Sequence, residues 1–207
     1  MASKFSADSL LQLVKHRRSY YALSKQLTIS HSRIDQIVKD SLLHVPSSFN
    51  SQSTRVAVLF DTEHDKLWDI VTEVLRKKVP EARWEPTGKK MNRFKQAGGT
   101  VMFFEDQTVV EKSKEQFPSY ADKFGGWATQ SDGMLQYTIW LALEAEGLGA
   151  NLQHYNPIID EKVAKEWNIP SNWKLNAQLV FGGIMDSPVE KTFMPLEERY
   201  RVFGSNL

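Results

Sequence analysis

Two sets of polar side chains have the composition of a ligand-binding site, and the first is basic. Arg17, Arg18 and Ser19 are consecutive and place two guanidinium groups and a hydroxyl at the end of an expected helix. Guanidinium groups bind phosphate oxygens through paired hydrogen bonds, so this set suits a phosphate group. It equally suits a solvated helix end, because cations there interact favourably with the helix dipole. The residues alone leave both interpretations open.

The second polar set follows the next expected helix. Directly after Pro46, the chain carries hydroxyl and amide side chains at Ser47, Ser48, Asn50 and Gln52. Short donors and acceptors of this kind can hydrogen-bond a polyol or the edge of a heteroaromatic ring. An ordinary polar turn is the alternative interpretation.

Other chemistries lack their signatures. The 207 residues include no cysteine, which excludes a thiol nucleophile, a disulfide scaffold and an iron–sulfur cluster. The five histidines form no HExxH or His-x-His motif, so we expect no metal site. GxSxG, P-loop and GxGxxG motifs are also absent, which disfavours a serine hydrolase, a P-loop enzyme and a dinucleotide-binding fold. Any redox chemistry therefore requires a bound cofactor.

Composition also constrains partners and location. The 26 basic and 25 acidic side chains nearly cancel, so no global charge favours nucleic acid. The richest apolar stretch, 134–143, is far shorter than the roughly 18 residues of a membrane span. The first residues lack the apolar core of a secretory signal. We expect a cytoplasmic protein, with a nuclear share open if the source is eukaryotic, and a single domain over residues 1–207.

The elements that must position the polar sets are helices and apolar strands. Helical spacing predicts helices over 8–18, 32–45, 65–78, 127–148 and 161–167, the first two capped by Ser6 or Asp8 and by Ser30 or Ser32. Apolar runs predict strands over 56–60, 100–104 and 178–184, with a further strand in the tail at 194–203 and a surface loop over 80–99. Strands that are apolar on both faces imply a sheet covered by helices.

The predicted helix over 127–148 is apolar on several faces. Trp127, Met134, Leu141 and Leu148 follow heptad spacing along it. A helix of this kind is buried at the centre of a fold or in a subunit interface.

Residues 22–38 merit comparison with a helix-turn-helix motif. The segment offers a short helix, a turn and a second helix that begins with serine, histidine and arginine. No glycine marks the turn and no basic charge is concentrated there. We therefore disfavour a DNA-binding function and expect no nucleic-acid partner.

Three motifs and the tail occur in an order typical of one family. The basic triplet at 17–19 is followed by PSSFNSQ at 46–52, GLGANLQHYN at 147–156 and the tail ERYRVF at 198–203. With these motifs the chain resembles the FMN-dependent nitroreductases, particularly their fatty-acid-repression-like branch, over essentially its whole length. The resemblance implies an α+β fold with a central, mainly antiparallel sheet flanked by helices, in an intertwined homodimer that binds two FMN molecules at its interface.

The resemblance also implies roles for individual residues. Arg17 and Ser19 are expected to hold the FMN phosphate, with Arg18 beside them and Arg199 or Arg201 closing on it. Ser47, Ser48 and Asn50 of the partner subunit, in the loop that includes Pro46 and Gln52, are expected to contact the flavin ring and the ribityl chain. The loop of Gln153, His154, Tyr155 and Asn156 is expected at the ring edge, where a backbone N–H meets flavin N5. No side chain is expected to be catalytic, because flavin N5 carries the chemistry.

This sequence departs from the family pattern at three places. Ser53-Thr54 follows the serine motif in place of Pro-Trp, and QHYN replaces a glycine-rich loop. Tyr21 stands where a lysine or arginine is frequent near flavin N1 and O2. A cation there stabilises anionic reduced flavin, so Arg18 or a lysine of 89–95 must supply it.

The implied reaction is a two-electron, ping-pong transfer of hydride from NADH or NADPH, through FMN, to a nitroaromatic or a quinone. Four aromatic residues are candidates for the wall or lid of the pocket for a small aromatic substrate: Phe117, Tyr120, Phe124 and Trp127. Gly125-Gly126 is a candidate hinge, and core packing is an equal interpretation for Trp127. The alternative function is a flavin-binding regulator in lipid or oxidative-stress signalling with little turnover.

Overall fold

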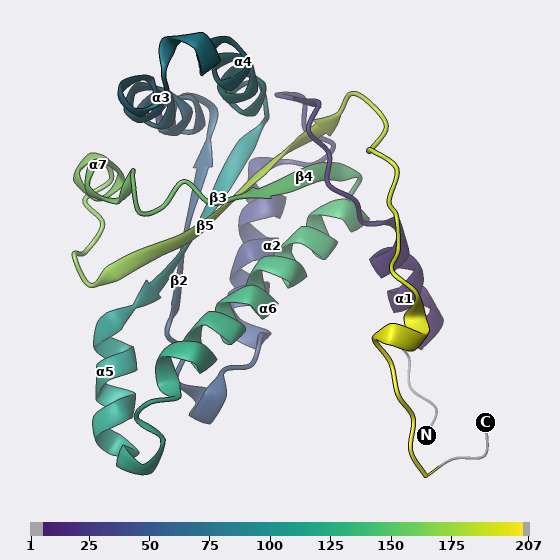
Figure 1. The fold of residues 1–207 in the computed structure, drawn as a ribbon, viewed down its shortest axis with the longest axis vertical. Helices are drawn as coiled ribbons and strands as arrows, with labels where there is room; N and C mark the ends of the chain where they lie inside the picture. The colour runs from purple at the N-terminus through teal and green to yellow at the C-terminus, as the bar shows by residue number, and fades with distance from the viewer. Residues whose placement is uncertain (1–5, 205–207) are drawn as a thin grey trace.

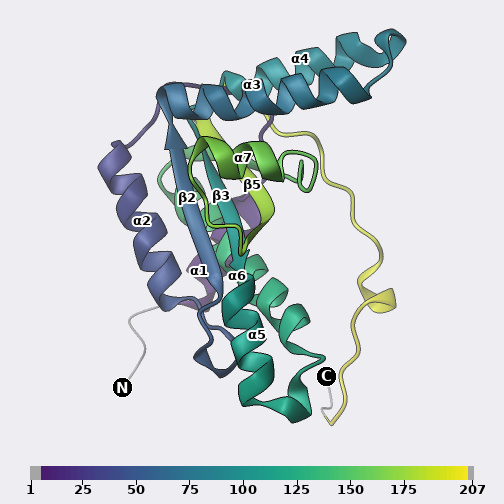
Figure 2. The same cartoon turned by 90° about the vertical axis from the view of Figure 1, so that its left-hand side faces the viewer.

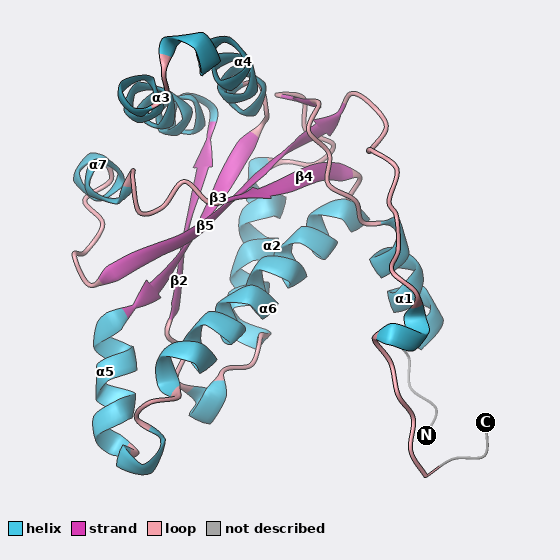
Figure 3. Cartoon of the chain, in the orientation of Figure 1, coloured by secondary structure: helices cyan, strands magenta, loops and turns pink. Residues whose placement is uncertain are grey.

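The computed structural model describes residues 6–204 and is built around one antiparallel sheet (Figures 1 and 3). Its strands are β1 (Leu23–Ser24), β2 (Thr54–Phe60), β3 (Gly99–Asp106), β4 (Leu148–Gln153) and β5 (Trp173–Ile184). The hydrogen-bonded order is β1, β5, β3, β2, with β4 on the other side of β5. The expected mainly antiparallel sheet and its three apolar strands are confirmed.

Strand β5 is the centre of the sheet because it pairs along both edges. Gln178 lies opposite Met102 of β3 on one side and opposite Gln153 of β4 on the other. Strand β4, which the sequence analysis did not predict, occupies the chain before the expected loop at 153–156, and only residues after Gln153 leave the sheet. Gly149 is required there, because a Cβ atom would lie 2.8 Å from Ile184 and 2.9 Å from Leu23.

Helices cover both faces of the sheet (Figure 2). They are α1 (Ala7–His16), α2 (His31–His44), α3 (Asp61–Lys78), α4 (Trp84–Lys95), α5 (Gln107–Gln116), α6 (Phe124–Ala145) and α7 (Asp160–Glu166). One core cluster joins α2 and α6 to the sheet through buried residues such as Ile34, Ile139 and Phe103. The other joins α3, α4 and α7 to the opposite face through residues such as Trp68, Phe94 and Val163.

The predicted caps of the first two helices are confirmed. The Ser6 hydroxyl accepts a hydrogen bond from the N–H of Asp8 at 3.2 Å. The Ser30 hydroxyl accepts one from the N–H of Arg33, also at 3.2 Å. Because α2 ends at His44, just before Pro46, the second polar set begins where the sequence predicts.

The prediction of a surface loop over 80–99 is wrong. Helix α4 occupies most of this segment and buries Met91 and Phe94 against α3. Pro86 is compatible with the helix because it lies in the first turn, where a backbone N–H has no partner within the helix. The helix-turn-helix pattern is not formed either, since Leu23 and Ser24 belong to strand β1.

Helix α6 runs along one face of the sheet; it has the predicted length of 22 residues but lies three residues nearer the N-terminus than predicted. It ends at Ala145, and Leu148 already belongs to β4. Leu135, Ile139 and Leu143 face the core, whereas Met134 and Tyr137 are exposed in the single chain. The heptad pattern therefore mixes two faces of the helix.

The tail after β5 does not form the predicted last strand. It contains one short 3-10 turn, Leu196–Glu198, and its residues are almost all exposed, including Phe193 and Phe203. A strand needs a hydrogen-bonding neighbour, and within residues 6–204 this segment has none. The tail runs down the outside of the molecule, away from the sheet (Figure 1).

A buried polar network fixes α3 and α4 to the sheet. His64 Nε2 lies 3.0 Å from the carbonyl oxygen of Phe94, so this nitrogen carries the proton. Its Nδ1 accepts from the Thr100 hydroxyl at 2.9 Å, and that hydroxyl accepts from the Trp68 indole N–H at 3.1 Å. Burial lowers the pKa of His64 to about 4, so the ring is neutral at physiological pH.

Candidate functional site

The basic triplet lies at the end of α1 and is attached to strand β4. Ser19 forms a parallel bridge with Ala150, and the N–H of Tyr20 donates to the Ala150 carbonyl at 3.0 Å. The Asn151 side chain donates to the Tyr20 carbonyl at 2.7 Å. The fold therefore brings the triplet beside the strand that leads to the loop 153–156, as a shared ligand site requires.

Arg17 is held in place by aromatic rings. Its guanidinium carbon lies 4.4 Å from the ring centroid of Trp140 and 5.9 Å from that of Tyr137, both on α6. Its Nε atom is buried and has no hydrogen-bond partner within the described chain. A buried donor without a partner is costly, so this guanidinium is suited to an anion that completes its hydrogen bonds.

A buried carboxylate lies beneath the triplet. Glu144 of α6 is almost completely buried, and its Oε1 atom lies 3.3 Å from Nδ1 of His16. Burial raises the pKa of Glu144, while the charges of His16 and Arg17 and the backbone N–H of Arg18 act in the opposite direction. The cations of this site are therefore partly balanced by an internal anion.

A cation that the sequence analysis missed lines the surface beside Tyr21. Arg93 of α4 lines two adjoining pockets, one with Ser19 and Tyr21 and one with Tyr21 and Met185. It forms no ion pair with a carboxylate of residues 6–204. The helical spacing of apolar residues in α4 is the signal that could have placed Arg93 on a helix. The prediction of a surface loop over 80–99 left that signal unused.

Two of the three lysines of 89–95 form ion pairs with carboxylates, and the third, Lys90, lies near the loop 153–156. Lys89 pairs with Glu85 and Lys95 with Asp69, each at 2.6 Å. Lys90 lies 5.9 Å from the ring centroid of Tyr155. The guanidinium of Arg18 donates to the backbone carbonyl of Val189. None of the cations expected to supply the missing charge lines the pockets beside Tyr21 in residues 6–204, whereas Arg93 lines both.

The loop 153–156 is fixed by its own hydrogen bonds. The Gln153 side chain donates to Asn151 at 2.8 Å. The backbone N–H of Tyr155 donates to the buried side chain of Gln178 at 2.8 Å, so it is not free for a ligand. Burial raises the pKa of Tyr155 to about 12, and its ring packs edge-on against Trp68. A free backbone donor in this loop must therefore come from another residue, and His154 is exposed.

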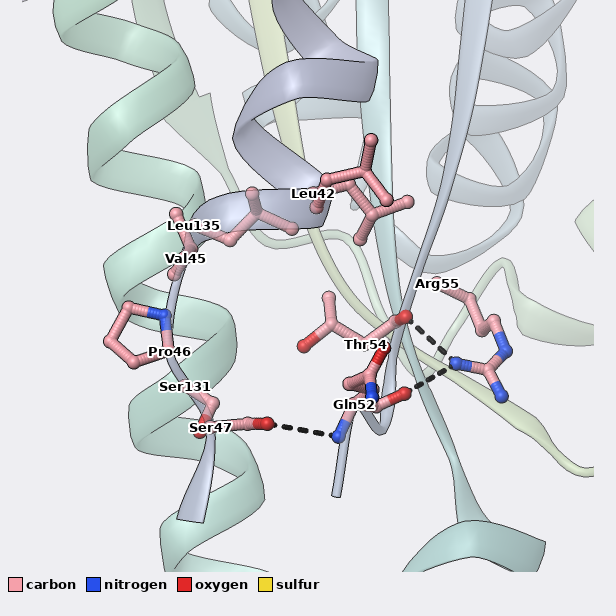
Figure 4. A pocket seen from close by; sticks show the side chains of 10 residues that line it. Leu42, Val45, Pro46, Ser47, Gln52, Thr54, Arg55, Ser131 and Leu135 are labelled. Carbon is pink, nitrogen blue, oxygen red and sulfur yellow. Dashed lines mark hydrogen bonds between the residues drawn. The ribbon is translucent and has the colours of Figure 1, made fainter. Parts of the chain in front are cut away.

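The second polar set forms a tight turn. The Ser47 hydroxyl accepts from the N–H of Gln52 at 2.9 Å, and Arg55 donates to the Gln52 carbonyl at 2.7 Å (Figure 4). Pro46, Ser47 and Gln52 line a pocket of about 210 Å³ with Leu42 and residues of α6. We call residues 46–52 the serine loop.

The four aromatic residues expected at a substrate pocket lie together, around a fifth that the sequence analysis missed. Phe49 of the serine loop packs against all four, at ring-centroid distances of 4.4 Å (Phe117), 5.7 Å (Phe124), 5.9 Å (Tyr120) and 6.0 Å (Trp127). We call these five residues the aromatic cluster. Gly125 and Gly126 lie inside the first turn of α6, so the predicted hinge is helical.

Arg199 and Arg201 lie in the exposed tail. The described hydrogen bonds of Arg201 are local, to the carbonyls of Glu197 and Tyr200. Neither arginine hydrogen-bonds to the basic triplet within residues 6–204. A single chain therefore leaves these residues apart from the expected phosphate site.

The two polar sets lie at opposite ends of α6. Arg17 packs on Trp140, whereas the aromatic cluster that contains Phe49 includes Trp127. Thirteen residues of helix separate the two tryptophans, which corresponds to about 20 Å. One chain therefore carries two separate half-sites, which we call the basic half-site and the serine half-site.

Residues 6–204 contain neither a candidate membrane span nor a candidate metal-binding cluster. No helix combines the length and hydropathy needed to cross a membrane. No three histidine, aspartate or glutamate side chains gather where they could share a metal ion.

The fold is that of the nitroreductases. The nitroreductase CinD from Lactococcus lactis, solved with chloramphenicol, matches with a TM-score of 0.87 and 42% identity, over 94% of this chain and all of that chain. A nitroreductase from Saccharomyces cerevisiae matches with a TM-score of 0.76 and 31% identity, over 87% of this chain and 98% of that chain.

The chain belongs to the nitroreductase family, whose model matches residues 14–183. The Saccharomyces cerevisiae protein HBN1 is 39% identical over 186 residues, which cover 89% of this chain and 92% of HBN1. Nitroreductase FRM2 of the same yeast is 34% identical over 186 residues, with the same coverage. The resemblance drawn from the four motifs is thereby confirmed.

Proposed function

We propose that the protein is an FMN-dependent oxidoreductase that uses NADH or NADPH to reduce nitroaromatics and quinones. The observation that carries the proposal is the basic half-site, where the Nε atom of Arg17 is buried and has no hydrogen-bond partner among residues 6–204. A phosphate oxygen supplies the acceptor that this guanidinium lacks. In this protein without cysteine, bound FMN supplies the hydride transfer, and the chain supplies binding, orientation and charge.

The residues of the basic half-site have separate tasks. Arg17 and Ser19 hold the phosphate, and Trp140 keeps the Arg17 guanidinium in a fixed orientation. Arg18 lies beside them, and Arg199 or Arg201 of the tail closes the site. Residues 153–156 lie against the edge of the flavin ring. No side chain has to act as an acid or base, because solvent can supply protons to an open site.

The serine half-site completes the cofactor site of a second copy. Ser47, Ser48 and Asn50 contact the flavin ring and ribityl chain of the FMN that the partner's basic half-site holds. Support for a homodimer comes from α6, whose exposed face carries Met134 and Tyr137, and from α1, which has no buried residue. Two copies with their α6 helices antiparallel bring the opposite half-sites together.

The substrate class is supported by relatives with substantial identity. CinD was solved with chloramphenicol and with 4-nitrophenol, which are both nitroaromatics. In this chain the aromatic cluster offers flat apolar surfaces for a small aromatic ring. The FMN-dependent nitroreductase NfnB from Mycobacterium smegmatis, solved with NADPH, is 18% identical to this chain, so its similarity supports the fold and not the substrate class.

Anaerobic mixing tests the proposal. The purified protein is loaded with FMN and mixed with NADH or NADPH, and flavin absorbance is followed. Bleaching within seconds, followed by recovery of absorbance on addition of 4-nitrophenol or a quinone, is the expected result. Bound flavin that neither nucleotide reduces would favour a regulator over an enzyme.

A further inference from the structure

Phe49 has an unusual backbone and an unusual environment for its residue type. Its φ and ψ angles are 53° and 24°, in the left-handed region. A bulky residue is rarely found there, because Cβ approaches the backbone too closely. Such a conformation persists only where the surroundings determine it.

The surroundings that determine it are aromatic. The Phe49 side chain is 54% exposed, yet its ring contacts four other rings of the aromatic cluster. Those rings come from the segment 117–127, which includes the start of α6. All four contacts have the separations that aromatic pairs favour, and the contact with Phe117 is the closest. The Phe49 ring therefore connects the serine loop to the expected substrate wall.

The rest of the serine loop depends on this connection. Asn50 and Gln52 also have positive φ angles, of 52° and 51°. Asparagine tolerates this conformation, whereas a bulky residue such as phenylalanine rarely adopts it. The hydrogen bond between Ser47 and Gln52 closes the turn at its ends, and Phe49 fixes the middle, between Ser48 and Asn50.

We propose that Phe49 is a positioning residue: by packing in the aromatic cluster it holds Ser48 and Asn50 in the geometry that binds FMN, and so couples the substrate wall to the cofactor site. This inference rests on the proposed function, in which the serine loop contacts FMN. The inference predicts that loss of the Phe49 ring weakens FMN binding. The effect is indirect, because the ring contacts other side chains and acts through the loop that they hold.

Titration of FMN into flavin-stripped protein, followed by flavin fluorescence, tests the proposal. Phe49→Leu should raise the Kd for FMN about tenfold, with an unchanged melting temperature, because the residue is half exposed. Trp84→Leu is the matched control, since the Trp84 ring packs against Arg76 on α3, outside the aromatic cluster. The control should bind FMN as the wild type does.

Two further variants separate positioning from a structural effect. Phe49→Asn keeps a residue that tolerates left-handed backbone but lacks the ring, and should bind FMN as weakly as Phe49→Leu. In a double-mutant cycle with Trp127→Leu, the effects on the Kd should be strongly non-additive, because both changes break one contact network. Wild-type affinity in Phe49→Asn, or additive effects in the cycle, would overturn the proposal.

The failure of this inference and that of the proposed function give different results. If the wild-type protein does not bind FMN, the proposed function fails. If it binds FMN, and Phe49→Leu binds it equally well, only the role of Phe49 is wrong.

Discussion

The guanidinium of Arg17 lies over the indole ring of Trp140, with 4.4 Å between the guanidinium carbon and the ring centroid. This contact holds a cation in a fixed orientation without using its hydrogen-bond donors. A carboxylate partner would occupy those donors, whereas an aromatic ring leaves them available. The basic half-site is therefore organised before a ligand arrives.

Replacement of Arg17 should weaken FMN binding severely. Arg17→Ala removes a charge-assisted hydrogen bond to phosphate, which is expected to cost about 2–3 kcal/mol, or roughly a hundredfold in Kd. Arg17→Lys should recover only part of this, because an ammonium group lacks the planar fork. Arg33→Ala is a control, since Arg33 pairs with Glu146 instead. Fluorescence titration gives the Kd values, and wild-type affinity in Arg17→Ala would contradict the phosphate assignment.

Arg93 should tune the reduced cofactor. If it supplies the cation that Tyr21 does not, Arg93→Gln should weaken the binding of reduced FMN more than that of oxidised FMN. A tenfold difference between these effects lowers the midpoint potential by about 30 mV for two electrons. Lys89→Gln is the matched control, because Lys89 pairs with Glu85. A potential that is equal in wild type and Arg93→Gln would assign the cation to another residue.

Asp132 should make the protein less stable at neutral pH than in weak acid. Its carboxylate accepts from Asn176 and Gln136, but Oδ1 is buried without a partner within the described chain. Burial raises the pKa of Asp132 from 3.8 to about 6, with Glu105 adding to the effect. Between these values the folded state keeps a proton that the unfolded state releases. The contribution of Asp132 to stability therefore falls as pH rises from about 4 to 6, by about 3 kcal/mol at most.

His64 acts in the opposite direction. Its folded pKa of about 4 lies below the ordinary histidine value of 6.5, so the unfolded state binds the extra proton and stability rises with pH across this interval. In Asp132→Asn, the dependence of the free energy of unfolding on pH should retain the contribution of His64 without the opposing contribution of Asp132. The free energy of unfolding of Asp132→Asn should rise more steeply from pH 4 to 6.5 than that of the wild type. At pH 8 it should be higher than the wild-type value.

Urea unfolding at several pH values measures both effects. Asp35→Asn is the control, because Asp35 forms an exposed ion pair with Lys39. A profile for Asp132→Asn that parallels the wild type would show that Asp132 titrates normally.

The sequence predicts those features that depend on local chemistry. Ser6 and Ser30 cap helices, and Pro46 ends one, because these effects act within a few residues. The strands 56–60, 100–104 and 178–184 were evident because they are apolar on both faces. The motif order was enough to identify the family and its fold.

Features that depend on distant contacts were missed. Helix α4 contains Pro86 and Gly88, which both disfavour a helix, and burial of Met91 and Phe94 against α3 stabilises it. Strand β4 contains Gly149, which reads as a helix stop until its close approach to Leu23 and Ile184 is known. Phe49 was missed for the same reason, since the rings it contacts lie at 117–127, and Arg93 was missed because α4 was predicted to be a loop.

Subunit mixing tests most directly whether two half-sites from different chains make one FMN site. One variant, Arg17→Ala, damages the basic half-site, and another, Ser48→Ala with Asn50→Ala, damages the serine half-site. Each alone should bind FMN poorly. After the two are unfolded and refolded together, half of the dimers are mixed and each holds one intact site, so about a quarter of all sites should bind FMN with wild-type affinity. Tight binding that does not appear in the mixture, although each variant dimerises, would contradict the account.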